Sequence, residues 1–211
     1  MPLDYQEGFA RCVESAKAHA GIAHLLRGIA YELGASKDLA GIAVSHAALA
    51  EEEAAKAAFC AMVSVGLAPP DILDPAFRDH RLKTYLFHAL ARRKILDIQT
   101  IGNRTTVTLK GQPIGDESLK GVWDEEIPEL KEHNDDRNAG FYVGKAGDKW
   151  LSPGEGCTDD PMALVYRYLN RAQVVLSFCQ VLLRKPFVSE ISNLRVEEVA
   201  GGGWSFTWDE I

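Results

Sequence analysis

The segment Glu52-Glu53-Ala54-Ala55-Lys56 lies in one of the most alanine-rich runs of this 211-residue chain. At about 100° per residue, one side of the helix that this run predicts mixes apolar and charged side chains. That side carries Ile42, Ser45, Leu49, Glu52, Lys56, Phe59, Cys60 and Val63. Glu52 and Lys56 therefore point where leucine would ordinarily lie. Because a charge turned into a core loses hydration worth several kcal/mol, we expect these two residues to serve a site. An alternative stays open, in which the acidic residues lie on a solvated face, since alanines do not show which side is buried.

The composition is that of an ordinary globular protein, with 46% hydrophobic and 25% charged residues. A net charge of −7 argues against a surface devoted to nucleic acid or membrane, although it allows a local basic patch. No apolar run approaches the ~18 residues of a membrane span, and the start lacks a signal-peptide layout. We therefore expect a cytoplasmic protein without membrane contact. The four cysteines show no zinc spacing, and no Glu-x-x-His repeat suggests a di-iron bundle, so we expect neither metal nor cofactor.

Helical periodicity, caps and breakers predict four main helices. The first spans residues 4–33, the third 74–99 and the fourth 160–185. The second begins after residue 36 or 38, both plausible caps, and ends at about residue 66. Between the last two we expect a β and loop insertion at about 100–157, with a strand at 105–109 and a short polar helix at 124–135. Residues 194–199 and 204–208 predict a C-terminal hairpin. The expected fold is mainly α, an up-and-down bundle with small β-hairpin decorations in the middle and at the C-terminus. We assign residues 1–190 to the bundle and 191–211 to an appendage.

Two further polar groups are candidates for chemistry. His80 and Lys83 are spaced i,i+3, so both side chains can serve one site; histidine exchanges protons near neutral pH and lysine can hold a phosphate. His133, Arg137 and Tyr142 lie in a second polar segment, 133–142. There arginine fits phosphate with paired donors, and tyrosine and histidine can move a proton or stack on a base. Each group alone also fits a structural role, as a helix surface or as a helix end followed by a turn.

The order of these motifs resembles the AbiV family of bacterial abortive-infection proteins, which belongs to the HEPN superfamily of helical bundles. The resemblance covers roughly residues 15–185, in the order EExxK, HxxK and RNxxxYV before a last long helix. The matching residues are Glu52, Glu53, Lys56, His80, Lys83, Arg137, Asn138, Tyr142 and Val143. The resemblance implies a HEPN-like bundle that forms homodimers. It also implies catalytic roles for Arg137, Tyr142, His80 and Lys83, with Glu52, Glu53, Lys56 and Asn138 in support.

The superfamily is known for metal-independent RNases whose motif is an arginine followed, after four to six residues, by a histidine. This chain departs from the motif, because Arg137 is followed after four residues by Tyr142. Tyrosine, with an unperturbed pKa of about 10, is a poorer general base at neutral pH. Arg81 and His88 match the spacing formally, but several arginines and histidines are present and chance can supply such a match, so we assign them no role.

Two functions therefore remain open. In the first, the protein is an antiphage effector that cleaves host or phage RNA: Arg137 holds the phosphate, Tyr142 or His80 moves protons, and Lys83 adds positive charge. In the second, a non-catalytic protein contacts a phage or host partner and arrests translation. Trp204 and Trp208 then offer a partner surface, unless they cover the bundle's own core.

Overall fold

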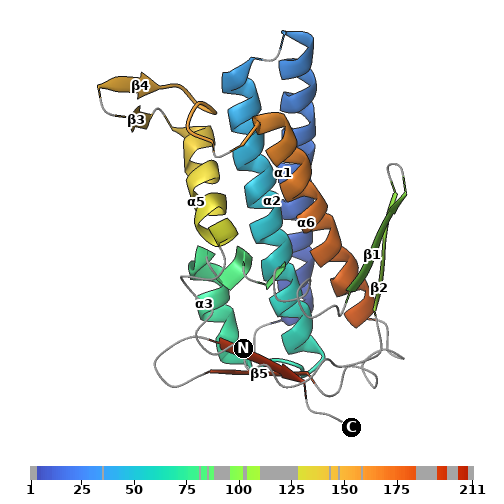
Figure 1. Cartoon of the computed structure of the whole chain (residues 1–211). Helices are drawn as coiled ribbons and strands as arrows, with labels where there is room; N and C mark the ends of the chain where they lie inside the picture. The colour runs from blue at the N-terminus through green and yellow to red at the C-terminus, as the bar shows by residue number, and fades with distance from the viewer. Residues whose placement is uncertain are drawn as a thin grey trace.

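In the part of the chain that the structure describes, four long helices form an up-and-down bundle (Figure 1). They are α1 (Tyr5–Glu32), α2 (Lys37–Ser64), α5 (Pro128–Phe141) and α6 (Pro161–Leu182). The computed structural model describes residues 4–34, 36–80, 82–84, 86–87, 96–101, 104–109, 128–142, 144–146, 148–157, 159–183, 194–198 and 204–208. Helix α2 is central and packs against α1, α5 and α6. The predicted mainly helical bundle is confirmed.

Caps and glycines set the ends of the long helices, as their sequences predict. The Asp4 side chain accepts hydrogen bonds from two backbone N–H groups of the first turn of α1. Asp160 does the same for α6 through the N–H of Ala163. After α1 and α2 the chain turns at Gly34 and Gly66, whose φ angles of 74° and 78° favour glycine. The predictions for α1, α2 and α6 are therefore confirmed to within a few residues.

Small side chains let the helices approach α2 closely. Its alanines are buried on several sides, and larger residues of the neighbouring helices fill the core around them. One part of the core includes Phe59, Met62, Ile72, Leu82, Leu86 and Phe178. The other includes Val44, Leu164, Val165 and Tyr168.

Two glycines bring α5 and a later loop against α2. A Cβ atom at Gly140 would lie 2.1 Å from the Ser45 Oγ and 2.2 Å from the Gly41 carbonyl oxygen. A Cβ atom at Gly41 would lie 2.4 Å from the backbone nitrogen of Gly154, in the loop between β4 and α6. No larger residue fits at either position without moving the backbone. Gly140 therefore sets the distance between α5 and α2, and Gly41 sets the distance between α2 and this loop.

The region predicted as a third helix, residues 74–99, is broken into shorter pieces. A 3-10 turn, η1 (Pro70–Ile72), leads into α3 (Leu73–Arg78), and Asp79 then adopts an extended conformation with ψ 113°. Residues 80, 82–84 and 86–87 are helical again, but Leu96–Ile101 form strand β1. The prediction of one continuous helix to Gln99 is therefore wrong. The predicted polar helix at 124–135 is α5, which extends further, to Phe141.

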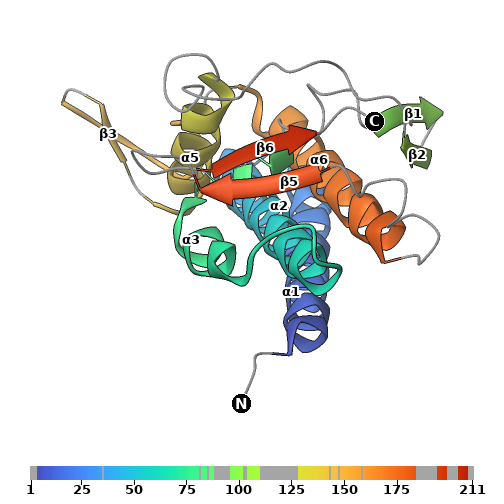
Figure 2. The ribbon, with the colours of Figure 1, turned by 90° about the horizontal axis from the view of Figure 1, so that it is seen from below.

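Three antiparallel hairpins accompany the helices. Strand β1 pairs with β2 (Arg104–Leu109), β3 (Gly144–Ala146) with β4 (Lys149–Leu151), and β5 (Leu194–Glu198) with β6 (Trp204–Trp208). The β3–β4 hairpin follows α5 at one end of the bundle, and β5–β6 lies across the opposite end (Figures 1 and 2). The side chains of Trp204 and Trp208 lie outside the described residues. None of the described helices is long and apolar enough to cross a membrane.

Candidate functional site

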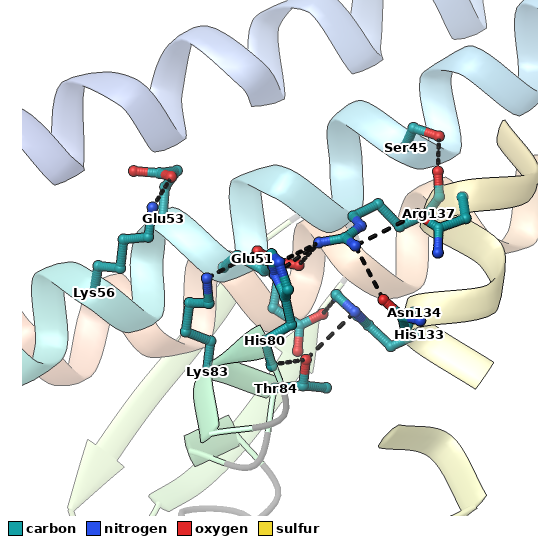
Figure 3. Close-up of polar contacts among 12 residues, drawn as sticks. Ser45, Glu51, Glu53, Lys56, His80, Lys83, Thr84, His133, Asn134 and Arg137 are labelled. Carbon is teal, nitrogen blue, oxygen red and sulfur yellow. Dashed lines mark hydrogen bonds and ion pairs between the residues drawn. The ribbon is translucent and has the colours of Figure 1, made fainter. Parts of the chain in front are cut away.

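Glu52 is the centre of a polar cluster inside the bundle. Its side chain is only 2% exposed, and basic groups from two other parts of the chain surround it. His80 Nδ1 lies 2.7 Å and Lys83 Nζ 3.3 Å from Glu52 Oε2. The guanidinium of Arg137 donates from NH1 to Glu52 Oε1 at 2.9 Å. The side chains of His80, Lys83 and Arg137 converge on this part of α2 (Figure 3). The prediction that Glu52 points inward is confirmed.

Arg137 reaches the cluster because α5 is fixed against α2. The Ser45 hydroxyl donates to the Arg137 carbonyl oxygen at 2.6 Å, one turn before the Gly140 crossing. The NH2 group of Arg137 donates to Asn134 Oδ1 at 3.0 Å and to Asn138 Oδ1 at 3.4 Å. Asn138, predicted as a supporting residue, therefore contacts the guanidinium. Hydrogen bonds on the two terminal guanidinium nitrogens hold its plane in one orientation.

His80 is the most accessible member, with 47% of its side chain exposed. Its Nδ1 lies 2.7 Å from Glu52 Oε2 and 2.7 Å from Arg137 NH1. A guanidinium can only donate and a carboxylate can only accept, so one Nδ1 cannot bond to both. The charge-assisted bond to Glu52 places the proton on Nδ1. In the neutral ring Nε2 is then the unprotonated nitrogen. It lies 3.3 Å from Arg137 NH1, from which it can accept a hydrogen bond, and it can also take a proton.

Burial and charge act in opposite directions on Glu52 and Lys83. Burial alone raises the pKa of the Glu52 carboxyl, but the positive charges around it outweigh that effect and hold the pKa below its ordinary value. The charges that do so are, in decreasing order, those of Lys83, His133 and His80. Burial lowers the pKa of Lys83, whose side chain is 2% exposed, and the attraction of Glu52 recovers only part of the loss. One carboxylate thus faces several basic groups, which leaves the cluster with an excess of positive charge.

Glu53 and Lys56 form a separate pair beside this cluster. Lys56 Nζ donates to Glu53, both side chains are 17% exposed, and the ammonium lies 5.4 Å from the centre of the Phe77 ring. Glu52 and Lys56, which were expected to serve one site, are therefore not paired with each other: Lys56 pairs with Glu53, and Glu52 pairs with Lys83 and Arg137. Lys56 still acts on the site through its charge, which lowers the pKa of Lys83 after the larger effects of burial and Glu52.

Tyr142 is not brought into the cluster. Its side chain is 66% exposed, and its ring packs at 6.3 Å from that of Phe141. Five residues along a helix turn a side chain by about 140°, so Tyr142 points away from the direction of Arg137. A catalytic role for Tyr142 stays a prediction. Val143, Arg81 and His88 lie outside the described residues.

Three buried polar residues lie behind the cluster, and the sequence assigned a site role to none of them, although His133 belongs to the polar segment 133–142. Glu51, Thr84 and His133 have side chains no more than 1% exposed. His133 Nε2 lies 3.4 Å from Glu51 Oε2, and His133 Nδ1 lies 3.3 Å from the hydroxyl of Thr84. Their positions in the sequence could have identified them as neighbours of the site. Glu51 is next to Glu52, Thr84 is next to Lys83, and His133 lies four residues before Arg137.

The cluster has the parts of a metal-free acid–base site. It combines a histidine oriented by a carboxylate, an arginine that can stabilise a negative oxygen, and a buried lysine. Among the described residues, no group of three or more His, Cys, Asp or Glu side chains is placed to hold a metal ion. This combination suits proton transfer next to a phosphate.

Comparisons with known proteins give one match. A family model of HEPN proteins described as AbiV matches residues 4–177, which is most of the chain. This range includes α1, α2, α5 and nearly all of α6, and every residue of the polar cluster. No curated protein and no solved structure matches the chain.

Proposed function

Because the chain belongs to the AbiV family of HEPN proteins, we propose that it is a cytoplasmic antiphage effector that cleaves RNA without a metal ion. Abortive infection is the context that the family indicates. The observation that carries the ribonuclease proposal is the contact between Arg137 and His80, whose NH1 and Nδ1 atoms lie 2.7 Å apart. The superfamily motif places an arginine and a histidine four to six residues apart in the sequence. Here two different helices supply them.

In the proposed reaction, Nε2 of His80 takes the proton of a ribose 2′-hydroxyl. The 2′-oxygen attacks the adjacent phosphorus, the bond from phosphorus to the 5′-oxygen breaks, and water protonates the leaving oxygen. Arg137 and the positive field of Lys83 stabilise the extra negative charge that the phosphate gains in the transition state. Glu52 positions His80 and Arg137 rather than contacting the RNA, because it is buried beneath them.

A cleavage assay with purified protein tests this proposal. We expect cleavage in the presence of EDTA, products with a 2′,3′-cyclic phosphate, and no cleavage where the 2′-hydroxyl is replaced by hydrogen. His80→Ala and Arg137→Ala should each lower the rate by about 10²-fold or more. Tyr142→Phe is the matched control and should retain the wild-type rate. Wild-type cleavage by Arg137→Ala would refute the assignment.

A non-catalytic role is the second candidate, and exposed aromatic residues favour it. Phe141 and Tyr142 are 37% and 66% exposed at the end of α5, away from the polar cluster. Such side chains are common at protein interfaces. In this role the protein binds a phage or host protein and arrests translation through that contact, with the hairpins as accessory surfaces. Growth arrest that survives His80→Ala but is lost on Tyr142→Ala would favour this role over RNA cleavage.

We propose that the working form is a homodimer. Four exposed apolar residues make one stripe along α1, at the helical spacing i, i+3, i+7 and i+11. They are Ile22, Leu25, Ile29 and Leu33. Pairing two such stripes would cover apolar surface that is otherwise in water. Leu25, which is 63% exposed, is the residue to change, and Leu25→Glu should shift the mass measured by light scattering from dimer to monomer.

A further inference from the structure

We propose that Glu51, His133 and Thr84 form a buried polar relay, joined by one ion-pair contact and one hydrogen bond, that positions the site histidine from behind. None of the three belongs to the motifs that mark the cluster. They come from α2, α5 and the helical residues 82–84, and they lie beneath the exposed face of the site (Figure 3). The relay itself depends only on contacts inside the protein. Its effect on catalysis rests on the proposed ribonuclease function.

The hydroxyl of Thr84 fixes the direction of the relay. It has one proton to donate and lies 3.1 Å from the carbonyl oxygen of His80, which can only accept. The same hydroxyl lies 3.3 Å from His133 Nδ1. Because the hydroxyl proton is used on His80, the bond to His133 requires the proton to be on Nδ1. The tautomer of one histidine is thus tied to the backbone position of the other.

The far side of the His133 ring faces Glu51. Nε2 lies 3.4 Å from Glu51 Oε2, close enough for an ion pair but too poorly aligned for a hydrogen bond. Neither carboxylate oxygen of Glu51 has a hydrogen-bond partner among the described residues. Both side chains are no more than 1% exposed, so a charge on either of them needs the other as its partner. A positive charge on His133 also stabilises the ionised form of the neighbouring Glu52.

The surroundings of His133 hold its ring in one place. The ring packs edge-on against Tyr168 at 4.9 Å, and the Tyr168 hydroxyl donates to Asp136 at 2.6 Å. Burial and this hydrogen bond raise the pKa of Tyr168, so the phenol stays neutral. Beyond Thr84, the titratable and charged groups around the ring are Glu51 and Glu52 on α2, Tyr168 and Arg171 on α6, and Asp136 on α5.

Thr84→Val tests the relay, because valine keeps the shape of threonine and removes the hydroxyl. In protein with ¹⁵N-labelled histidine, we expect the wild-type spectrum at pH 7 to show protons on Nδ1 of both His80 and His133. The exposed His24 provides an internal reference. In Thr84→Val, His133 should lose its fixed Nδ1 proton, because its partner is gone. The ring signals of His80 should shift, because its backbone carbonyl has lost the Thr84 hydroxyl, although Glu52 still holds its proton on Nδ1. Thr84→Ser should restore both.

Glu51→Gln is the matched control, since a glutamine amide can still donate to Nε2 and leave the proton on Nδ1. This variant should leave the ¹⁵N signals of the His80 ring unchanged. A wild-type His133 protonated only on Nε2, or His80 ring signals that do not shift in Thr84→Val, would overturn the relay. If Thr84→Val does not fold, the wild-type and Thr84→Ser spectra still decide the matter.

The RNA assay separates this inference from the proposed function. If the protein cleaves RNA, Thr84→Val should lower the rate by about tenfold to a hundredfold through misplacement of His80. If the spectra agree with the relay but no variant cleaves RNA, the ribonuclease proposal fails and the relay stands. If RNA is cleaved and Thr84→Val cleaves at the wild-type rate with unchanged spectra, the relay fails and the ribonuclease proposal stands.

Discussion

Replacing Glu52 by glutamine should destabilise the protein far more than the same change one residue later. Glutamine keeps the shape of the side chain but leaves Lys83 and Arg137, with side chains 2% and 14% exposed, without their shared negative partner. Breaking a buried ion pair costs about 3–5 kcal/mol. His80 is 47% exposed and can be rehydrated, so we expect the lower part of this range, about 3 kcal/mol.

Unfolding in urea measures the effect. With a slope of about 2–3 kcal/mol per molar for a chain of this size, a loss of about 3 kcal/mol moves the midpoint by about 1–1.5 M. Glu53→Gln is the control, because the pair of Glu53 and Lys56 is more exposed and should be worth only about 0–1 kcal/mol. Equal midpoints for the two variants would refute the view that Glu52 holds the cluster together.

A double variant shows whether the loss comes from unpaired charge. Adding Lys83→Met to Glu52→Gln removes a buried ammonium that has lost its carboxylate. The second change should therefore restore part of the stability, with a coupling of about 0.5–3 kcal/mol between the two positions. If the losses in the free energy of unfolding of the two single variants simply add in the double variant, the attraction between Lys83 and Glu52 contributes little to stability.

Two further predictions concern the packing around the site. Burial lowers the pKa of His46, and the imidazole of His19 on α1 lowers it further. The unfolded chain therefore binds a proton at this position more readily than the folded chain, so the free energy of unfolding should fall as the pH drops from about 7 to 5. Urea unfolding at each pH should show a smaller fall for His46→Gln. Gly140→Ala should cost about 1–3 kcal/mol or more in the same assay, because its Cβ would lie 2.1 Å from the Ser45 Oγ, whereas Gly21→Ala on α1, with nothing within 4 Å, should be neutral or slightly stabilising.

The sequence could predict the bundle and the inward direction of Glu52, because both follow from helical periodicity and caps. It could also predict that His80, Lys83 and Arg137 belong together, though only through the order of motifs that resembles the AbiV family. Their convergence on one carboxylate depends on how separate helices pack against each other. The spacing of residues along one helix does not determine that packing.

The errors have local causes. Lys56 can reach an acidic residue three or four positions earlier, and side-chain conformation selects Glu53. The third helix was predicted to be continuous because no proline or glycine marks Asp79, where the backbone becomes extended. Tyr142 was grouped with Arg137 because the helix was predicted to end before both, whereas α5 continues to Phe141 and turns the two side chains apart.

An arginine and a histidine on one helix keep their spacing whenever that helix forms. Arg137 and His80 instead meet only when α5 and the helical residues after Asp79 are both packed on α2. The close crossing at Gly140 and the buried bonds of Thr84 therefore control the pair from a distance, although neither residue faces the substrate side. A displacement of either element that leaves the rest of the bundle in place would therefore separate the guanidinium from the imidazole. It follows that Gly140→Ala should reduce activity more steeply than its loss of stability alone explains, as measured by cleavage rates under conditions where the variant remains fully folded.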